Sequence, residues 1–176
     1  MTDVEADVAM MQTYTGYNNS YFYPIWTQFA AGELWDGESC SEIACCMSYL
    51  AGNISKIYVS NYAQGLASLF QSAGRFGSTP AVGAFIWFDY DNDGVPDHTG
   101  RVMSITGSNI HTFEGNVGGM TVQRDYAVGT SYIYGYGYPN YDNQPIPEPP
   151  DPPAPPAPGG KHYLPFWRHK RRERGS

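Results

Sequence analysis

Basic side chains are scarce in this sequence, whose 176 residues hold ten Lys and Arg against 17 Asp and Glu. The shortage is sharper over residues 1–160, where four basic residues face sixteen acidic ones. A strongly acidic surface repels polyphosphates, which argues against a nucleic-acid partner. Residues 161–176 reverse the sign, with six basic residues and one acidic residue.

Cysteines and long apolar runs are also few. Cys40, Cys45 and Cys46 are odd in number and two are adjacent, so they do not form a disulfide framework, and we expect reduced thiols. No apolar run approaches the roughly 18 residues of a membrane span. The acidic first residues do not resemble a secretion signal, so we expect a protein that is cytoplasmic until it is released.

The order of helical and strand patterns predicts the fold class. Apolar periodicity predicts helices over residues 3–14, from Cys40 to a stop at Gly52, and over 60–73. Short apolar or alternating runs predict strands over residues 84–88, 102–105, 109–113, 120–126 and 131–138. Helices first and antiparallel strands afterwards predict an α+β domain with N-terminal helices packed on one face of the sheet.

Composition divides the chain into three parts. Residues 1–141 carry the predicted elements, and 142–160 form a proline-rich linker, a stiff extended spacer. Residues 161–176 are too few for a core and mix aromatic with basic side chains. This tail is either solvated or an anchor to an anionic surface such as wall polymer or lipid headgroups. We expect a monomer.

Cys40 is the candidate nucleophile. Ser39 and Glu42 have the spacing of a helix capping box, which places Cys40 at the first helical position. Unpaired amides and the positive end of the helix dipole favour a thiolate there. Cys45 and Cys46 lie further along the helix and are interpreted as small buried hydrophobic residues.

A thiol nucleophile needs a base and a group that orients the base. The chain offers His98, followed by Glu114 or Asn116 at the end of the next strand. His111 is the competing imidazole, but it lies within a strand and has no acidic or amide partner at a suitable position.

Strand register decides whether His98 and Glu114 meet. A two-residue turn at Gly107 and Ser108 would put their side chains on opposite faces, because side chains alternate along a strand. A three-residue loop over 106–108 would pair Gly100 with Glu114 and His98 with Asn116. Catalysis by these groups therefore requires an odd loop or a compensating β-bulge.

An acidic loop precedes His98. Asp89, Asp91, Asp93 and Gly94 match the first half of an EF-hand, with Asp97 at the ninth position. The twelfth position holds Gly100 in place of the usual glutamate. The loop is therefore either a calcium site that fixes the His98 segment or an acidic turn.

Four segments occur in a characteristic order: CSEIACCMSYLAG from Cys40, FDYDNDGVPDH ending at His98, TFEGN around Glu114, and GYGYP at 135–139. Together they resemble the CHAP domain, a family of cysteine- and histidine-dependent amidohydrolases and peptidases of phage endolysins and bacterial wall hydrolases. The resemblance implies a papain-like, NlpC/P60-type fold. It also implies Cys40 as nucleophile, His98 as general base, Glu114 as the group that orients the imidazole, and Asn116 as a supporting group.

The resemblance further implies a substrate and a reaction. The substrate would be the peptide part of peptidoglycan, cut at an amide through an acyl-thioester, most simply by a phage lysin with no required cofactor. Two alternatives stay open: a non-catalytic wall-binding or virion structural module with the same fold, and a thiol protease or transglutaminase-like enzyme that acts on proteins.

Overall fold

The computed structural model describes residues 1–147 except 31, 36–38 and 143. Among these residues, the helices all precede the strands along the chain. The helices are α1 (Asp3–Thr13), η1 (Asn19–Tyr21), α2 (Tyr23–Trp26), α3 (Cys40–Leu50), η2 (Ile54–Lys56) and α4 (Ala63–Ser72), with η marking short 3-10 helices. The strands are β1 (Phe76–Gly77), β2 (Phe85–Phe88), β3 (His98–Thr106), β4 (Asn109–Val117), β5 (Met120–Ala127) and β6 (Ile133–Gly137).

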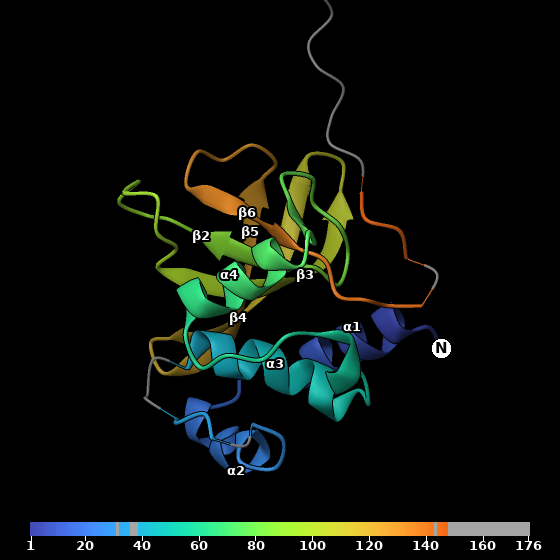
Figure 1. The fold of residues 1–176 in the computed structure, drawn as a ribbon, viewed down its shortest axis with the longest axis vertical. Coiled ribbons are helices and arrows are strands. Elements are labelled where there is room, and N and C mark those ends of the chain that lie inside the picture. The colour runs from blue at the N-terminus through green and yellow to red at the C-terminus, as the bar shows by residue number, and fades with distance from the viewer. Residues whose placement is uncertain (31, 36–38, 143, 148–176) are drawn as a thin grey trace, which may run out of the picture.

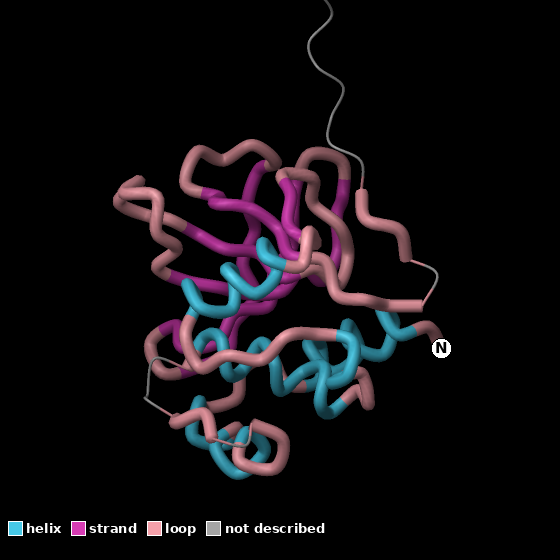
Figure 2. The backbone as a smooth tube through the Cα atoms, viewed as in Figure 1, coloured by secondary structure: helices cyan, strands magenta, loops and turns pink. Residues whose placement is uncertain are grey.

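The described strands form one antiparallel sheet in the order β1-β6-β2-β3-β4-β5. The helices gather on one side of it, with α2 farthest from the strands (Figures 1 and 2). Phe85, Trp87 and Phe113 of the sheet join the core formed with the helices. Ile86, Phe88 and other buried residues build a smaller core with Tyr136 of β6 and Tyr138, which follows it. The predicted α+β class is confirmed.

Helix starts follow local backbone geometry. At α1 the capping box involves Thr2, which bonds the Glu5 amide and receives the Glu5 carboxylate at its own amide. The box predicted at Ser39 is wrong: Ser39 has φ −64° and ψ 15°, not the extended N-cap conformation, and makes no side-chain cap bond. The third predicted helix begins later than expected, at Ala63, because Tyr62 is extended.

A buried ion pair joins the helices to the sheet. Arg101 of β3 and Asp7 of α1 are both 0% exposed, and Arg101 Nη2 lies 2.6 Å from Asp7 Oδ2. Arg101 Nη1 also donates to Ser48 Oγ at 2.9 Å and to the Ala44 carbonyl of α3 at 3.1 Å. This contact fixes α3 relative to β3.

The chain after β6 stays attached to the domain for several residues. Tyr141 is buried, and the Asp142 amide bonds Asp3 Oδ2 at 2.9 Å. Gln144 Nε2 donates to the Val82 carbonyl at 3.0 Å. Most of the predicted linker, and all of the predicted tail at 161–176, lie outside the described residues. No helix in the described part of the chain has the length and apolarity to cross a membrane.

Candidate functional site

Cys40 opens α3, as the sequence predicts, and is 6% exposed. Close packing sets the distance of α3 from β4, because a Cβ added to Gly115 would lie 2.7 Å from Ile43 Cβ. Cys45 and Cys46 are 0% exposed. Burial raises the pKa of the Cys45 thiol to about 12 and that of Cys46 further still, which suits core residues and not nucleophiles.

The β3–β4 hairpin reaches the required register by a bulge. Thr106 pairs with Asn109, so the turn has two residues and would by itself put His98 and Glu114 on opposite faces. The register then shifts between Val102 and Ser104, where Met103 is one extra residue, and Gly100 pairs with Glu114. The compensating bulge that the sequence analysis required is therefore present.

His98 and Glu114 contact each other as a result. His98 Nε2 donates to Glu114 Oε2 at 3.0 Å, and the Glu114 side chain is 0% exposed. Burial alone would lower the pKa of His98, but hydrogen bonds to Cys40 and Glu114 and the charges of these groups raise it to about 9. Burial would raise the pKa of Glu114, yet its bonds to His98 and Thr112 and the His98 charge lower it overall.

The structure thus brings together Cys40, His98 and Glu114 from three elements. Because Nε2 of His98 is bonded to Glu114, Nδ1 is the ring nitrogen left for the thiol. The sulfur, the imidazole and the buried carboxylate follow one another in this order, which is the arrangement of a nucleophile, a base and a group that orients the base.

Glu114 has partners that the sequence analysis missed. Thr112 Oγ1 donates to Glu114 Oε1 at 2.6 Å, and Arg124 Nη1 lies 3.7 Å from Oε2. Opposite Glu114, an added Cβ on Gly100 would lie 2.8 Å from Glu114 Cγ. The alternation of Thr112 and Glu114 along one strand is the sequence signal that would have linked them.

Aromatic rings cover one side of the imidazole. Phe88 stacks on His98 with ring centroids 5.8 Å apart, and Tyr90 stacks at 6.3 Å. Next to them lies an open hollow of about 370 Å³, with Tyr90, His98, Asn116 and Arg124 among its lining residues. The imidazole of His98 is therefore accessible from this side, whereas Cys40 does not line the hollow.

Asn116 lines the hollow but bonds elsewhere. Its backbone has φ 61°, and its Oδ1 accepts from Asn19 Nδ2 at 2.7 Å. The backbone N–H of Asn116 donates in turn to Asn19 Oδ1 at 3.3 Å. The predicted pairing of His98 with Asn116 is not part of the observed register, which runs as far as Gly100 and Glu114.

His111 does have an acidic partner, contrary to the sequence analysis. It pairs with Asp125 across β4 and β5, and Nδ1 lies 2.6 Å from Asp125 Oδ1. Asp125 comes from a later strand, so the spacing of residues around His111 gave no sign of it. His111 sits opposite Ser104 near the turn, whereas His98 lies at the open end of the hairpin.

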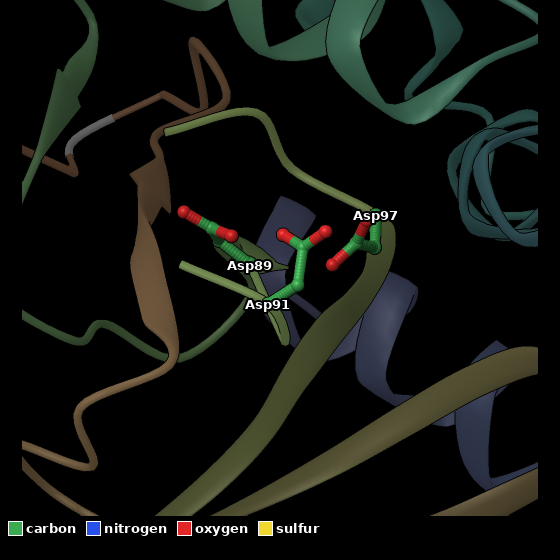
Figure 3. Close-up of side chains that lie close together, drawn as sticks. All are labelled: Asp89, Asp91 and Asp97. Atoms are coloured by element: carbon green, nitrogen blue, oxygen red, sulfur yellow. The ribbon is translucent and has the colours of Figure 1, made fainter. Parts of the chain in front are cut away.

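Three of the four acidic candidates for calcium lie together. Oxygens of Asp89, Asp91 and Asp97 are within 4.8 Å of one another (Figure 3). Asp93 is not in the group, and its Oδ1 accepts from the Val95 amide at 2.8 Å.

Loop amides also use these carboxylates. Asp89 accepts from the amide of Gly94 at 2.9 Å, and Asp97 from that of Tyr90 at 2.6 Å. Although a bond from the Asp93 amide lowers it, the pKa of Asp91 is raised on balance by burial and by nearby carboxylates. Hard oxygen donors and mutual repulsion fit a Ca²⁺ ion, which would take Asp89, Asp91 and Asp97 as ligands.

Comparisons with known proteins do not assign this chain to a family. No family model matches the sequence, and no curated protein matches it. Similar solved structures are the crystal structure of Ly7917, with 16% identity and a TM-score of 0.49, and that of Ly7917 with the hydrolyzing product of MDP, with 15% identity and a TM-score of 0.49. Each match covers 78% of this chain, and 62% or 63% of the other. This chain therefore spans less than two thirds of their length, and the similarity is too low to support a function.

Proposed function

We propose that this protein is a thiol-dependent peptidoglycan hydrolase of the CHAP type, with a papain-like, NlpC/P60-type fold, that cuts an amide bond in the wall peptide. The observation that carries the proposal is the contact of Cys40, at the start of α3, with His98, which Glu114 holds in turn. The order of the sequence motifs supports the substrate class. Asn116 lines the hollow beside His98 and is proposed as a supporting group.

The chemistry begins with a proton already on the imidazole. With a pKa of about 9, His98 is protonated at neutral pH and faces the sulfur as a cation. The Cys40 thiolate attacks the amide carbonyl, a C–S bond forms, and the carbonyl electron pair moves to oxygen. The backbone amide of Cys40, at the start of α3, would stabilise that oxyanion.

Collapse of the tetrahedral intermediate completes the first half of the reaction, the acylation of Cys40. The C–N bond breaks, and the leaving amine takes the proton of His98. The neutral imidazole then accepts a proton from water, whose hydroxide attacks the thioester carbonyl, and the C–S bond breaks. The products are a carboxylic acid and the Cys40 thiolate, with His98 protonated again. Glu114 remains ionised and keeps the ring oriented.

Mass spectrometry of purified bacterial walls treated with the protein tests this function. We expect fragments with new amino and carboxyl termini at one amide, which identifies the bond between muramic acid and L-alanine, or one within the stem or cross-bridge. Prior alkylation with iodoacetamide should abolish release, since Cys40 is partly accessible while Cys45 and Cys46 are 0% exposed. New reducing sugar ends, or release that survives alkylation, would contradict the proposal.

We also propose that the acidic loop binds calcium and fixes the segment that leads into His98. Isothermal titration of the protein with CaCl₂ should give a one-site isotherm that Asp91→Asn abolishes, because Asp91 faces the cluster. Asp93→Asn is the matched control in the same loop and should keep the isotherm, since Asp93 points to the Val95 amide. No heat with an active wild-type protein, or equal loss in both variants, would reject the site.

The site of action that goes with this chemistry is the bacterial cell wall. We propose the role of a phage lysin, made in the cytoplasm and acting on the wall after release. The basic segment at 161–176 is the proposed anchor to anionic wall polymer or lipid.

A further inference from the structure

The carboxylate that orients His98 is itself held at both oxygens. Glu114 Oε2 accepts from His98 Nε2 at 3.0 Å, and Oε1 accepts from Thr112 Oγ1 at 2.6 Å. Thr112 and Glu114 are both 0% exposed, so water does not compete for either oxygen. With one oxygen bound to each partner, the plane of the carboxylate is fixed.

Of the groups around Glu114, Thr112 is the one that makes a hydrogen bond to Oε1. The Tyr126 hydroxyl is buried close enough to help lower the pKa of Glu114, but it makes no hydrogen bond of ordinary geometry within the described residues. Gly100 stands directly across from Glu114 and provides space for its side chain, but no contact that would hold it from that side. Arg124 Nη1 is 3.7 Å from Oε2, beyond hydrogen-bond distance, and its side chain is 44% exposed. An ion pair at that distance, with a solvent-exposed guanidinium, contributes little to orientation.

The Thr112 hydroxyl is well suited to the role. A hydroxyl has one proton to donate, and the carboxylate at 2.6 Å is a better acceptor than the Arg124 carbonyl at 3.2 Å. As a β-branched residue in a buried strand, Thr112 has a restricted side-chain rotamer. The direction of the Thr112 hydroxyl therefore does not depend on its bond to Glu114.

We propose that Thr112 is a positioning residue, which sets the orientation of the His98 ring toward Cys40 through the Glu114 carboxylate. This inference rests on the proposed function for its kinetic part. Loss of the hydroxyl leaves Glu114 bonded at Oε2 alone, to His98, so the plane of the carboxylate and the orientation of the imidazole are no longer fixed. The chemical step should be affected more than binding, because Thr112 is buried and does not line the hollow beside His98.

The test compares Thr112→Val with Thr112→Ser on a soluble wall fragment that the wild type cleaves. Thr112→Val should lower kcat about 10- to 100-fold, with KM within about threefold, since small misplacements of reacting groups have effects of this size. Thr112→Ser restores the hydroxyl and should stay within about threefold of wild-type kcat. A role in stability alone would lower the melting temperature of Thr112→Val without this split between kcat and KM.

Thr121→Val is the matched control. Thr121 is also a buried strand threonine, but its hydroxyl donates to the Tyr14 carbonyl at 2.6 Å and has no bond to Glu114. It should lose stability and keep wild-type kcat. Wild-type kcat in Thr112→Val, or an equal fall in Thr112→Ser, would overturn the proposal.

A spectroscopic measurement separates this inference from the proposed function. The His98 ring proton on Nε2, bonded to Glu114, should give a downfield NMR signal that Glu114→Gln weakens or removes. Thr112→Val should shift or broaden the signal, and Thr112→Ser should keep it. An unchanged signal in Thr112→Val would reject the positioning role, even if the wild type proves inactive on walls.

Discussion

Cys40→Ala is expected to lower kcat on wall fragments by about 10⁴-fold or more, as loss of the nucleophile does in triad hydrolases. The thioester has no other sulfur to form on, because Cys45 and Cys46 are 0% exposed. Without the sulfur, His98 retains its carboxylate partner but has no group to activate. The rate of amine release under saturating substrate measures the effect.

Cys45→Ala is the matched control for Cys40→Ala. Both residues lie in α3, but burial raises the pKa of the Cys45 thiol to about 12, and the thiol makes a weak contact, 3.8 Å, with the Tyr58 carbonyl. It should keep wild-type kcat with a modest loss of stability. Full activity in Cys40→Ala would place the nucleophile elsewhere. Equal wall binding by wild type and Cys40→Ala, with no clearing by either, would favour a wall-binding module.

The sequence predicted those parts of the site that depend on residues close together in the chain. Cys40 could be placed at a helix start because apolar spacing marks that helix, even though the expected Ser39 cap does not form. The meeting of His98 with Glu114 could be stated only as a condition on register. The observed bulge at Met103 meets that condition, and a bulge of one residue in a strand leaves no clear mark in a single sequence.

Contacts made by residues far apart in the chain were less predictable. Arg101 and Asp7 are 94 positions apart, and His111 and Asp125 belong to different strands whose pairing depends on the whole sheet. In the acidic loop, the spacing identified the carboxylates but not the directions in which their side chains point. Asp93 caps a turn while Asp97 joins the cluster, a choice made by backbone bonds that composition does not encode.

Asp7→Ala is expected to lower the free energy of unfolding by about 3–5 kcal/mol, because it leaves Arg101 charged, buried and without its carboxylate. Asp125→Ala removes a carboxylate whose contact with His111 has the same 2.6 Å length, but the Asp125 side chain is 72% exposed. The control should change stability by about 0.5 kcal/mol or less. Urea denaturation of both variants at pH 7 measures the difference.

The same carboxylate gives stability a dependence on pH. Burial alone would raise the pKa of Asp7, but the Arg101 charge and bonds from Ser48, Tyr141 and Asn53 lower it overall, below the usual range of an aspartate. Stability from Asp7 is therefore complete above the unfolded pKa and is lost as pH falls through the folded one. Asp7→Ala should lack this part of the acid transition. Wild-type stability of Asp7→Ala at pH 7 would mean that Ser48, Tyr141 and backbone carbonyls satisfy Arg101 without the carboxylate. The ion pair would then not be what holds α3, with Cys40 at its start, against β3, which begins at His98.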